Sequence, residues 1–207
     1  MKPTRLIIVR HGNTFLPEET PRRVGGLTDL PLVPSGEAQA RLLGEHFKAL
    51  GILPAVIYTG PLLRTRQTAK IMAEAAGWGT AIEIEPCLRE LDYGPDENQP
   101  EPAVIKRIGT AALEAWEKQA RVPAGWKVDM GGLLKSWELI GEQTLEHYEG
   151  QTVIVVTSNG IARFAAALVG GLEAFGARYG FKLATGAYGV FEETQTGWEV
   201  CEWNTRP

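Results

Sequence analysis

The sequence has little of what marks several classes of protein. Its two cysteines, Cys87 and Cys201, lie far apart and belong to no CxxC or Cys/His spacing typical of a metal site. This suits a reducing compartment, in which we expect both side chains to be buried as small apolar groups. No apolar run approaches the roughly 20 residues of a membrane span, and the first residues lack the layout of a signal peptide. We therefore expect a cytoplasmic protein that binds no membrane.

A surplus of basic residues is also absent. The 207 residues include 21 lysines and arginines against 25 acidic residues, which gives a formal net charge of −4. General binding to nucleic acid depends on a basic surplus, so we expect no nucleic-acid partner. Any phosphate chemistry must then rely on a local cluster of arginines. The hydrophobic content of 44% and the charged content of 22% are those of an ordinary globular protein.

Short runs rich in β-branched residues alternate with helical patterns along the chain. The runs expected to form strands are 5–9, 55–58, 82–85 and 152–156. Helices are expected over 35–50, with Ser35 as its N-cap, and over 61–76, with Gly77 after its end. This alternation predicts the α/β class, a three-layer sandwich with a mostly parallel central sheet.

The segment 92–149 interrupts the alternation. It begins with the polar stretch "DYGPDENQPEP" and continues with a helix expected over about 102–120 and a second, Trp-rich helical stretch. We interpret it as a small helical insertion in a single domain that spans 1–207. Two strand-like segments, 189–193 and 198–203, follow in a glycine-rich tail and are expected at a sheet edge.

Polar motifs follow the expected strands, at the ends where ligands bind in open α/β sheets. Arg10 and His11 follow the first run, and Arg64 lies one turn into the helix after the second. "LRELDYG" supplies Glu90, and "TSNG" places Asn159 at the start of a helix. Arginine forks and a helix N-terminus bind phosphate oxygens, and a neutral histidine between them can attack phosphorus. The sequence therefore predicts a phosphate site that contains a nucleophile.

The motifs "LIIVRHGNT", "GGLTDLPLVPSGEAQA", "YTGPLLRTRQTA" and "LRELDYG" resemble, in order, those of the histidine phosphatase superfamily, the phosphoglycerate mutase-like proteins. The resemblance implies the phosphoglycerate mutase-like fold and a reaction that needs no cofactor. It implies that His11 is phosphorylated, that Arg10 and Arg64 bind the phosphoryl group, and that Glu90 protonates the leaving oxygen. Asn13 is expected to contact the phosphate from the turn.

The chain departs from the family at a second histidine, which the family has in "SHG" and this chain replaces by Ser158-Asn159-Gly160. Asparagine keeps a hydrogen-bond donor and loses the positive charge. Gly160 is expected to let the helix N-terminus approach the phosphate. Neither His46 nor His147 is placed to substitute, so we expect Asn159 to slow the site without silencing it.

Other residues have two interpretations each. Arg22 and Arg23, in the loop 17–27, either read a second charged group on the substrate or are solvated. Trp116, Trp126 and Trp137 either stack on a substrate ring or belong to the core.

The expected function is a metal-independent phosphatase that acts on small phosphate monoesters through a phosphohistidine. The alternatives are a mutase, which returns the phosphoryl group to its substrate, and a module that binds phosphorylated ligands without turnover. The sequence does not fix the oligomeric state, for which a homodimer is one option.

Overall fold

A six-stranded mixed sheet lies at the centre of the computed structural model, which describes residues 2–207. The strand order is β3-β2-β4-β1-β5-β6. The strands are β1 (Arg5–Arg10), β2 (Pro54–Thr59), β3 (Ile82–Ile84), β4 (Thr152–Thr157), β5 (Tyr188–Thr194) and β6 (Gly197–Thr205). The first four are parallel, whereas β5 and β6 continue the sheet as antiparallel strands. The predicted α/β class with a mostly parallel sheet is confirmed.

Strands β1 and β4 form the buried centre of the sheet. They run in register, with Arg5 opposite Thr152 and Arg10 opposite Thr157. Their inner residues are buried apolar side chains, mostly β-branched, which suit a sheet covered on both faces. Because the two strands end at the same level, the segments that follow them begin side by side.

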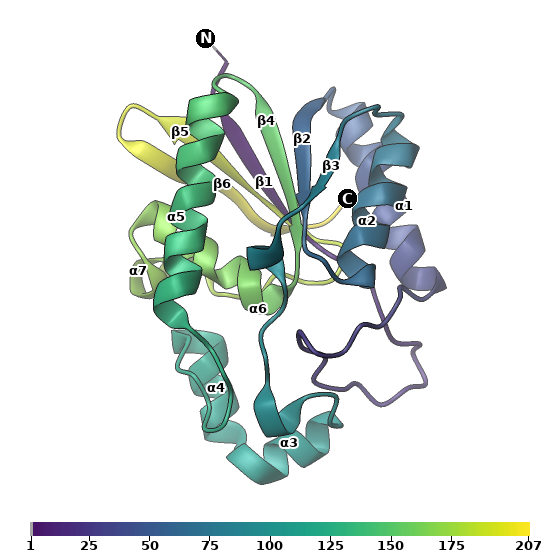
Figure 1. Ribbon diagram of the computed structural model, residues 1–207, viewed down its shortest axis with the longest axis vertical. Helices are drawn as coiled ribbons and strands as arrows, with labels where there is room; N and C mark the ends of the chain where they lie inside the picture. Colours follow the sequence, from purple (N-terminus) through teal and green to yellow (C-terminus); the bar gives the residue numbers. More distant parts are fainter. Residues whose placement is uncertain (1) are drawn as a thin grey trace.

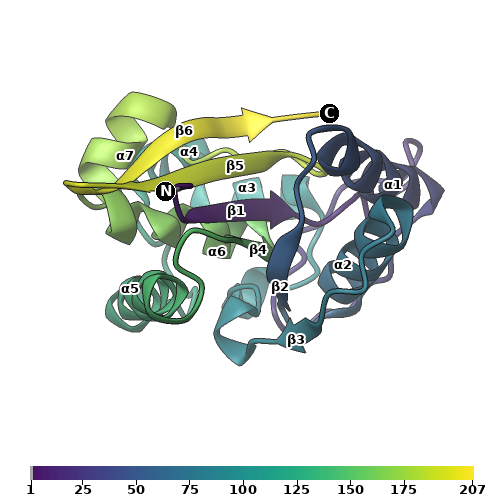
Figure 2. The same cartoon turned by 90° about the horizontal axis from the view of Figure 1, so that it is seen from above.

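Helices cover both faces of the sheet, as Figures 1 and 2 show. Helices α1 (Pro34–Ala49) and α2 (Leu63–Ala76) pack together on one face, and α5 (Met130–His147), α6 (Asn159–Ala162) and α7 (Leu172–Tyr179) lie on the other. The predicted Ser35 cap is wrong, because Pro34 already stands inside α1 and Val33 precedes it without a capping side chain. The predicted end of α2 is confirmed, with Gly77 in the left-handed conformation at φ 75°.

The segment 92–149 contributes α3 (Glu101–Ile108), α4 (Thr110–Gln119) and α5. The single helix expected over 102–120 is broken at Gly109, whose φ of 82° is incompatible with a continuous helix. Figure 1 places α3 and α4 below the sheet, beyond the ends of the parallel strands. Trp116, Trp126 and Trp137 are buried, so they belong to the core. This segment therefore covers the edge of the fold at which the parallel strands end.

The described residues 2–207 also form the 3-10 helices η1 (Pro86–Leu88), η2 (Gly94–Asp96) and η3 (Arg163–Val169). The prediction that both cysteines are buried is wrong, because Cys201 is exposed on the edge strand β6 and Cys87 is half-buried. Helix α7 was not predicted, since the glycines around it obscure its apolar pattern.

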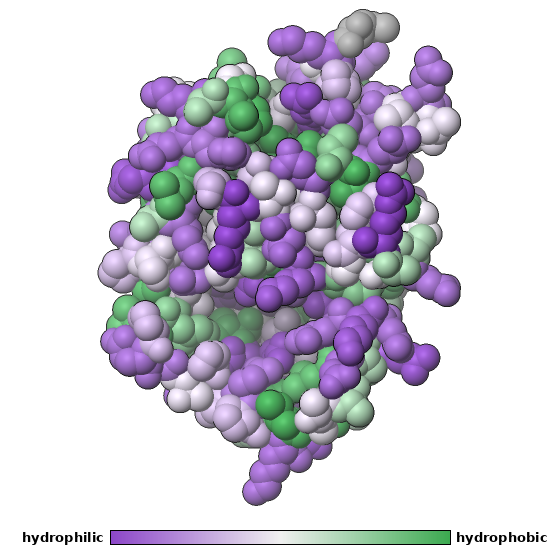
Figure 3. All heavy atoms as spheres, turned by 180° about the vertical axis from the view of Figure 1, so that it is seen from behind, coloured by the Kyte–Doolittle hydropathy of each residue, from purple (hydrophilic) through white to green (hydrophobic). Residues whose placement is uncertain are grey.

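The surface in Figure 3 is largely hydrophilic, with apolar residues in separate small patches. Within residues 2–207, no single helix is long and apolar enough to cross a membrane. In this described part of the chain, one bent pair, the α6–η3 segment taken together with α7 across a bend of 109°, satisfies the criteria of length and composition.

Candidate active site

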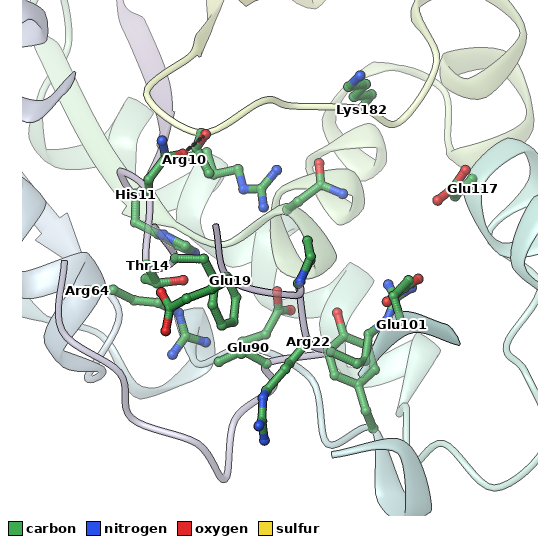
Figure 4. A pocket seen from close by; sticks show the side chains of 18 of the residues that line it. Arg10, His11, Thr14, Glu19, Arg22, Arg64, Glu90, Glu101, Glu117 and Lys182 are labelled. Atoms are coloured by element: carbon green, nitrogen blue, oxygen red, sulfur yellow. Dashed lines mark hydrogen bonds and ion pairs between the residues drawn. The ribbon is translucent and has the colours of Figure 1, made fainter. Parts of the chain in front are cut away.

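A cavity of about 690 Å³ opens beyond the carboxyl ends of the parallel strands. Figure 4 shows side chains from several elements pointing into it. The sequence-predicted residues in its wall are Arg10, His11, Asn13, Arg22, Arg23, Arg64, Glu90 and Asn159. Among the predicted site residues, Gly160 alone is not part of the wall.

His11 is buried, with 6% of its surface exposed, and its orientation is fixed by its neighbours. Its Nδ1 lies 2.8 Å from the carbonyl oxygen of Gly12. Since a carbonyl oxygen can only accept, Nδ1 carries the proton in this contact and Nε2 keeps its lone pair. Burial holds the pKa of His11 well below its ordinary value, and the charges of Arg64 and Arg10 lower it further. The imidazole is therefore neutral at neutral pH, as a nucleophile requires.

The turn after β1 packs tightly against α1. A Cβ atom at Gly12 would lie 2.3 Å from the carbonyl oxygen of Gly36, so only glycine fits. The Gly12 N–H donates to Thr68 Oγ1 at 3.1 Å, and the His11 N–H donates to the Thr157 carbonyl at 3.0 Å. These contacts fix the histidine between the ends of β1 and β4.

Arg10 directs part of its guanidinium into the cavity. Its Nη1 donates to the Leu183 carbonyl at 2.8 Å, while its buried Nε has no partner within residues 2–207. Burial lowers the pKa of Arg10, and the nearby Glu90 carboxylate raises it in part. Figure 4 shows Arg10 and Arg64 on either side of His11.

Arg64 is only 1% exposed and is held by a loop. Its Nη1 donates to the Thr28 carbonyl at 2.9 Å and its Nη2 to the Gly25 carbonyl at 3.1 Å. That loop is in turn fixed by Glu97, whose carboxylate accepts from the Gly25 N–H at 3.0 Å and from Thr28 Oγ1 at 2.7 Å. The stretch "PDENQP" thus orients Arg64, a function that the sequence did not reveal.

Glu90 is buried at the edge of the cavity, next to the start of α6. Its Oε2 accepts from the Gly160 N–H at 3.3 Å, and its Oε1 accepts from the Leu91 N–H at 2.9 Å. A Cβ atom at Gly160 would lie 2.1 Å from Glu90 Oε1. Gly160 therefore allows the close approach of Glu90, to which its N–H is directed, and its expected contact with phosphate stays a prediction. Moreover, α6 is a single turn that continues as the 3-10 helix η3.

Asn159 lines the cavity with its amide oriented by the backbone. Its Oδ1 accepts from the Leu183 N–H at 2.7 Å. The Nδ2 group then carries two N–H donors that have no partner within the described residues 2–207, and these donors remain for a ligand.

The other predicted residues already form hydrogen bonds or ion pairs within the protein. Asn13 donates from Nδ2 to Ser35 Oγ at 3.2 Å, and its Oδ1 accepts from Thr185. Arg23 forms an ion pair with Glu101, which neutralises its charge.

Arg22 is exposed on the same loop and donates to the Asn98 carbonyl at 3.3 Å. Backbone hydrogen bonds from Asn98 to Arg23 and from Arg23 to Gln99 tie this loop to the segment before α3.

Arg163 is a cavity residue that the sequence reasoning missed. It is only 2% exposed and begins η3, four residues after Asn159. That spacing is one helical turn, so the position could have been expected on the same face as Asn159. Lys182 also lines the cavity but is exposed.

Comparison with known proteins agrees with this geometry. The sequence profile of the histidine phosphatase superfamily, branch 1, matches residues 6–206. The chain belongs to the histidine phosphatase superfamily.

Among sequence relatives, this superfamily member is 37% identical over 128 residues to the probable phosphoglycerate mutase GpmB of Yersinia enterocolitica. The match covers 58% of this chain and 54% of that protein, so the chain spans about half the length of the curated relatives it matches.

Among solved structures, mycobacterial glucosyl-3-phosphoglycerate phosphatase superposes with a TM-score of 0.81 at 21% identity, covering 99% of this chain and 100% of the other. The α-ribazole phosphatase of Shigella flexneri superposes with a TM-score of 0.71 at 18% identity, covering 98% and 96%. These likenesses show that this member of the superfamily shares its fold with both proteins.

Proposed function

We propose that this chain is a phosphatase that hydrolyses small phosphate monoesters through a phosphohistidine, without a metal ion. The observation that carries the proposal is His11: a buried, neutral imidazole, protonated on Nδ1 toward Gly12, between two arginines that form no salt bridge within residues 2–207. A neutral nucleophile beside two cations suits attack on a phosphate dianion.

The first step follows from these contacts. His11 Nε2 attacks phosphorus, and the N–P bond forms as the ester P–O bond breaks. The leaving oxygen takes a proton from the Glu90 carboxyl group and departs as an alcohol. Arg10 and Arg64 donate to the phosphoryl oxygens, and the free amide N–H groups of Asn159 replace the donor that a second histidine would supply.

The second step regenerates the protein. Water attacks the phosphorus of the phosphohistidine and gives a proton to the Glu90 carboxylate, while the P–N bond breaks. Inorganic phosphate leaves and His11 regains its lone pair. Glu90 therefore acts first as an acid and then as a base, for which its buried position beside the cavity is suited.

A mutase is the runner-up, because it differs only in returning the phosphoryl group to its substrate. The Yersinia sequence relatives bear a mutase name, while the two structural neighbours named above are phosphatases that the chain matches over nearly their full length. The brief helical insertion supports hydrolysis. The product distinguishes the two: a phosphatase releases inorganic phosphate, whereas a mutase forms an isomeric ester.

The test is phosphate release from a panel of phosphate monoesters in the presence of a chelator, for the native protein and His11→Ala. His147→Ala is the matched control, because His147 is exposed and precedes β4 at the opposite end of the sheet. We expect turnover in the native protein and the control and none in His11→Ala. Turnover that survives His11→Ala, or that the chelator abolishes, contradicts the proposal.

The non-enzymatic alternative is a module that binds phosphorylated ligands. It predicts tight binding of a phosphate ester without turnover, and activity that first appears in Asn159→His.

A further inference from the structure

The peptide group between Gly12 and Asn13 is hydrogen-bonded at both ends. Its carbonyl oxygen, on Gly12, accepts from His11 Nδ1 at 2.8 Å. Its N–H, on Asn13, donates to Oε1 of Gln39 at 2.8 Å. Because the C=O and N–H of a trans peptide point in opposite directions, His11 and Gln39 lie on opposite sides of one planar group. Gln39 is therefore connected to the nucleophile through a single peptide bond.

The side chain of Gln39 is held in place for this contact. Gln39 is half-buried on α1, and its stem packs against the backbone of Gly186. A Cβ atom at Gly186 would lie 2.8 Å from the Cβ of Gln39, and the φ of Gly186 is 66°, so this packing requires glycine. The Gly186 N–H donates to the His11 carbonyl at 3.2 Å. The glutamine thus has a fixed position relative to His11.

Other contacts attach the same turn to the rest of the fold. The Gly12 N–H donates to Thr68 Oγ1 at 3.1 Å, and the Asn13 carbonyl accepts from the Val33 N–H at 3.1 Å. The place of the turn therefore does not depend on Gln39 alone. What Gln39 supplies is an acceptor on the peptide group that His11 itself contacts.

We propose that Gln39 is a positioning residue for phosphoryl transfer, and that it acts on His11 through the peptide group between Gly12 and Asn13. This inference rests on the proposed function and deepens it. An acceptor on a peptide N–H polarises the group and makes its carbonyl oxygen a stronger acceptor. The Gly12 oxygen then holds the proton on Nδ1 more firmly. The lone pair stays on Nε2, the nitrogen that attacks phosphorus.

The same polarisation favours the reaction itself. When the lone pair of Nε2 forms the bond to phosphorus, the ring keeps its Nδ1 proton and takes up a positive charge. The Gly12 oxygen faces that charge through the hydrogen bond, so a more negative oxygen stabilises the transition state more than the free enzyme. In the Ser-His-Asp triad a carboxylate does this for the histidine directly. Here Gln39 and a peptide group act in its place, without a further negative charge beside the phosphate.

A purely structural role for Gln39 makes a different prediction. Gln67 of α2 is the matched comparison, because it is also half-buried and its Oε1 accepts from the Leu32 N–H at the same distance of 2.8 Å. The peptide that Gln67 holds lies outside the turn that carries His11. Loss of either acceptor leaves one backbone N–H without its partner, so both losses should lower stability alike. Only loss of the Gln39 acceptor should change the reactivity of His11.

The kinetic test compares Gln39→Met, Gln39→Glu and Gln67→Met. Methionine is similar in size to glutamine but is only a weak acceptor, whereas glutamate keeps an acceptor oxygen. For Gln39→Met we expect kcat for a phosphate monoester to fall by about tenfold with little change in KM. This is the lower end of the effect of groups that orient metal-binding histidines through their second nitrogen. Gln39→Glu should restore most of kcat, and Gln67→Met should leave kcat and KM at their native values.

Nitrogen and proton NMR of isotope-labelled histidine gives a second readout, which needs no substrate. In the native protein at neutral pH we expect His11 to be protonated on Nδ1 and unprotonated on Nε2. In Gln39→Met the Nδ1–H proton signal should move to lower frequency, because its hydrogen bond weakens. Gln67→Met should keep the native signal, and the spectrum of His11→Asn identifies which signal belongs to His11.

A native kcat together with a native Nδ1–H signal in Gln39→Met overturns the assignment. Equal losses of kcat in Gln39→Met and Gln67→Met overturn it as well, because they indicate a structural effect. If thermal unfolding shows that Gln39→Met does not fold, Gln39→Asn replaces it, since its shorter side chain withdraws the acceptor from Asn13, and the same outcomes apply. A failure of the proposed function appears separately, as absence of turnover in the native protein, and it leaves the NMR comparison intact.

Discussion

The side-chain oxygen of Asn159 accepts a hydrogen bond of 2.7 Å from the backbone N–H of Leu183. This single contact decides which end of the amide a ligand meets, because it occupies the oxygen and leaves the NH₂ group for the cavity. A doubly protonated imidazole at the same position could not accept from Leu183. The asparagine is therefore oriented as a neutral donor.

Replacement of the amide by a carboxylate tests this orientation. Asn159→Asp keeps the acceptor for Leu183 and turns the NH₂ group into an oxygen that repels phosphate. We expect kcat/KM for a phosphate ester to fall by at least about 10²-fold, the usual cost of one donor to a developing oxyanion.

The matched control is Asn204→Asp. Asn204 accepts from the Ala184 N–H at 2.7 Å in the same way but lies on β6, outside the cavity wall. An unchanged rate in Asn159→Asp would show that the amide does not face the reacting group.

Addition of a positive charge at the same position should move the pH profile. His11 reacts as the neutral imidazole, and its pKa is already lowered by burial and by Arg64 and Arg10. An imidazolium introduced by Asn159→His lowers that pKa further. We expect the acidic limb of the kcat/KM profile to lie at higher pH in the native protein than in the variant. Steady-state rates between pH 4 and 8 measure the acidic limb for the native protein and for the variant. Coinciding profiles would contradict the argument.

The sequence predicts the main strands of the fold and four of the residues in the site. Strand periodicity and turn residues placed β1, β2 and β4 correctly, and the rule that ligands bind at strand ends gathered His11, Arg10, Arg64 and Glu90. The structure places these four side chains in one cavity wall. Such features depend on local patterns and on the geometry of parallel sheets, which are visible in a sequence.

Contacts between distant segments could not be read in the same way. Gly160 meets Glu90 across 70 residues of sequence, and Asn159 meets the backbone of Leu183 across 24. Neither contact leaves a periodic signal. Arg163 resembled any helical arginine, because only its burial against Trp116 sets it apart.

Gly160→Ala should act on catalysis through Glu90. The added Cβ would lie 2.1 Å from Glu90 Oε1 and must displace that carboxyl group. General acids contribute about 10² to 10⁴ in rate, so we expect kcat to fall by at least about tenfold with little change in KM. In a Glu90→Gln background the same substitution should have little further effect, since both changes remove one function.

The control is Gly131→Ala, at a glycine of α5 whose Cβ would meet only Asp129 at 3.8 Å. Rate losses that simply add in the double variant would argue against a role through Glu90.

Glu97→Ala should weaken phosphate binding from a distance. Without its carboxylate, the Gly25 N–H and the Thr28 hydroxyl lose their acceptor, and the loop whose carbonyls hold Arg64 is released. We expect KM for a phosphate ester to rise several-fold and the free energy of unfolding to fall by about 1 to 3 kcal/mol. Kinetics and urea unfolding measure the two effects. Glu83→Ala, on the exposed edge strand β3, is the control and should change neither.

The buried His11 should make folding sensitive to acid. Its pKa in the folded protein lies well below the value of about 6.5 expected in the unfolded chain, mainly because of burial. As the pH falls below about 6.5, His11 becomes protonated in the unfolded chain but stays neutral in the folded protein. The free energy of unfolding therefore falls by up to about 1.4 kcal/mol per pH unit until the pH reaches the pKa of His11 in the folded protein. His11→Asn removes this pH-dependent loss of stability, whereas His147→Asn, a substitution of an exposed histidine, keeps it. Urea unfolding at pH 7.5 and 5.5 should therefore show a smaller loss of stability for His11→Asn than for the native protein, and equal losses would mean that His11 is protonated in the folded state.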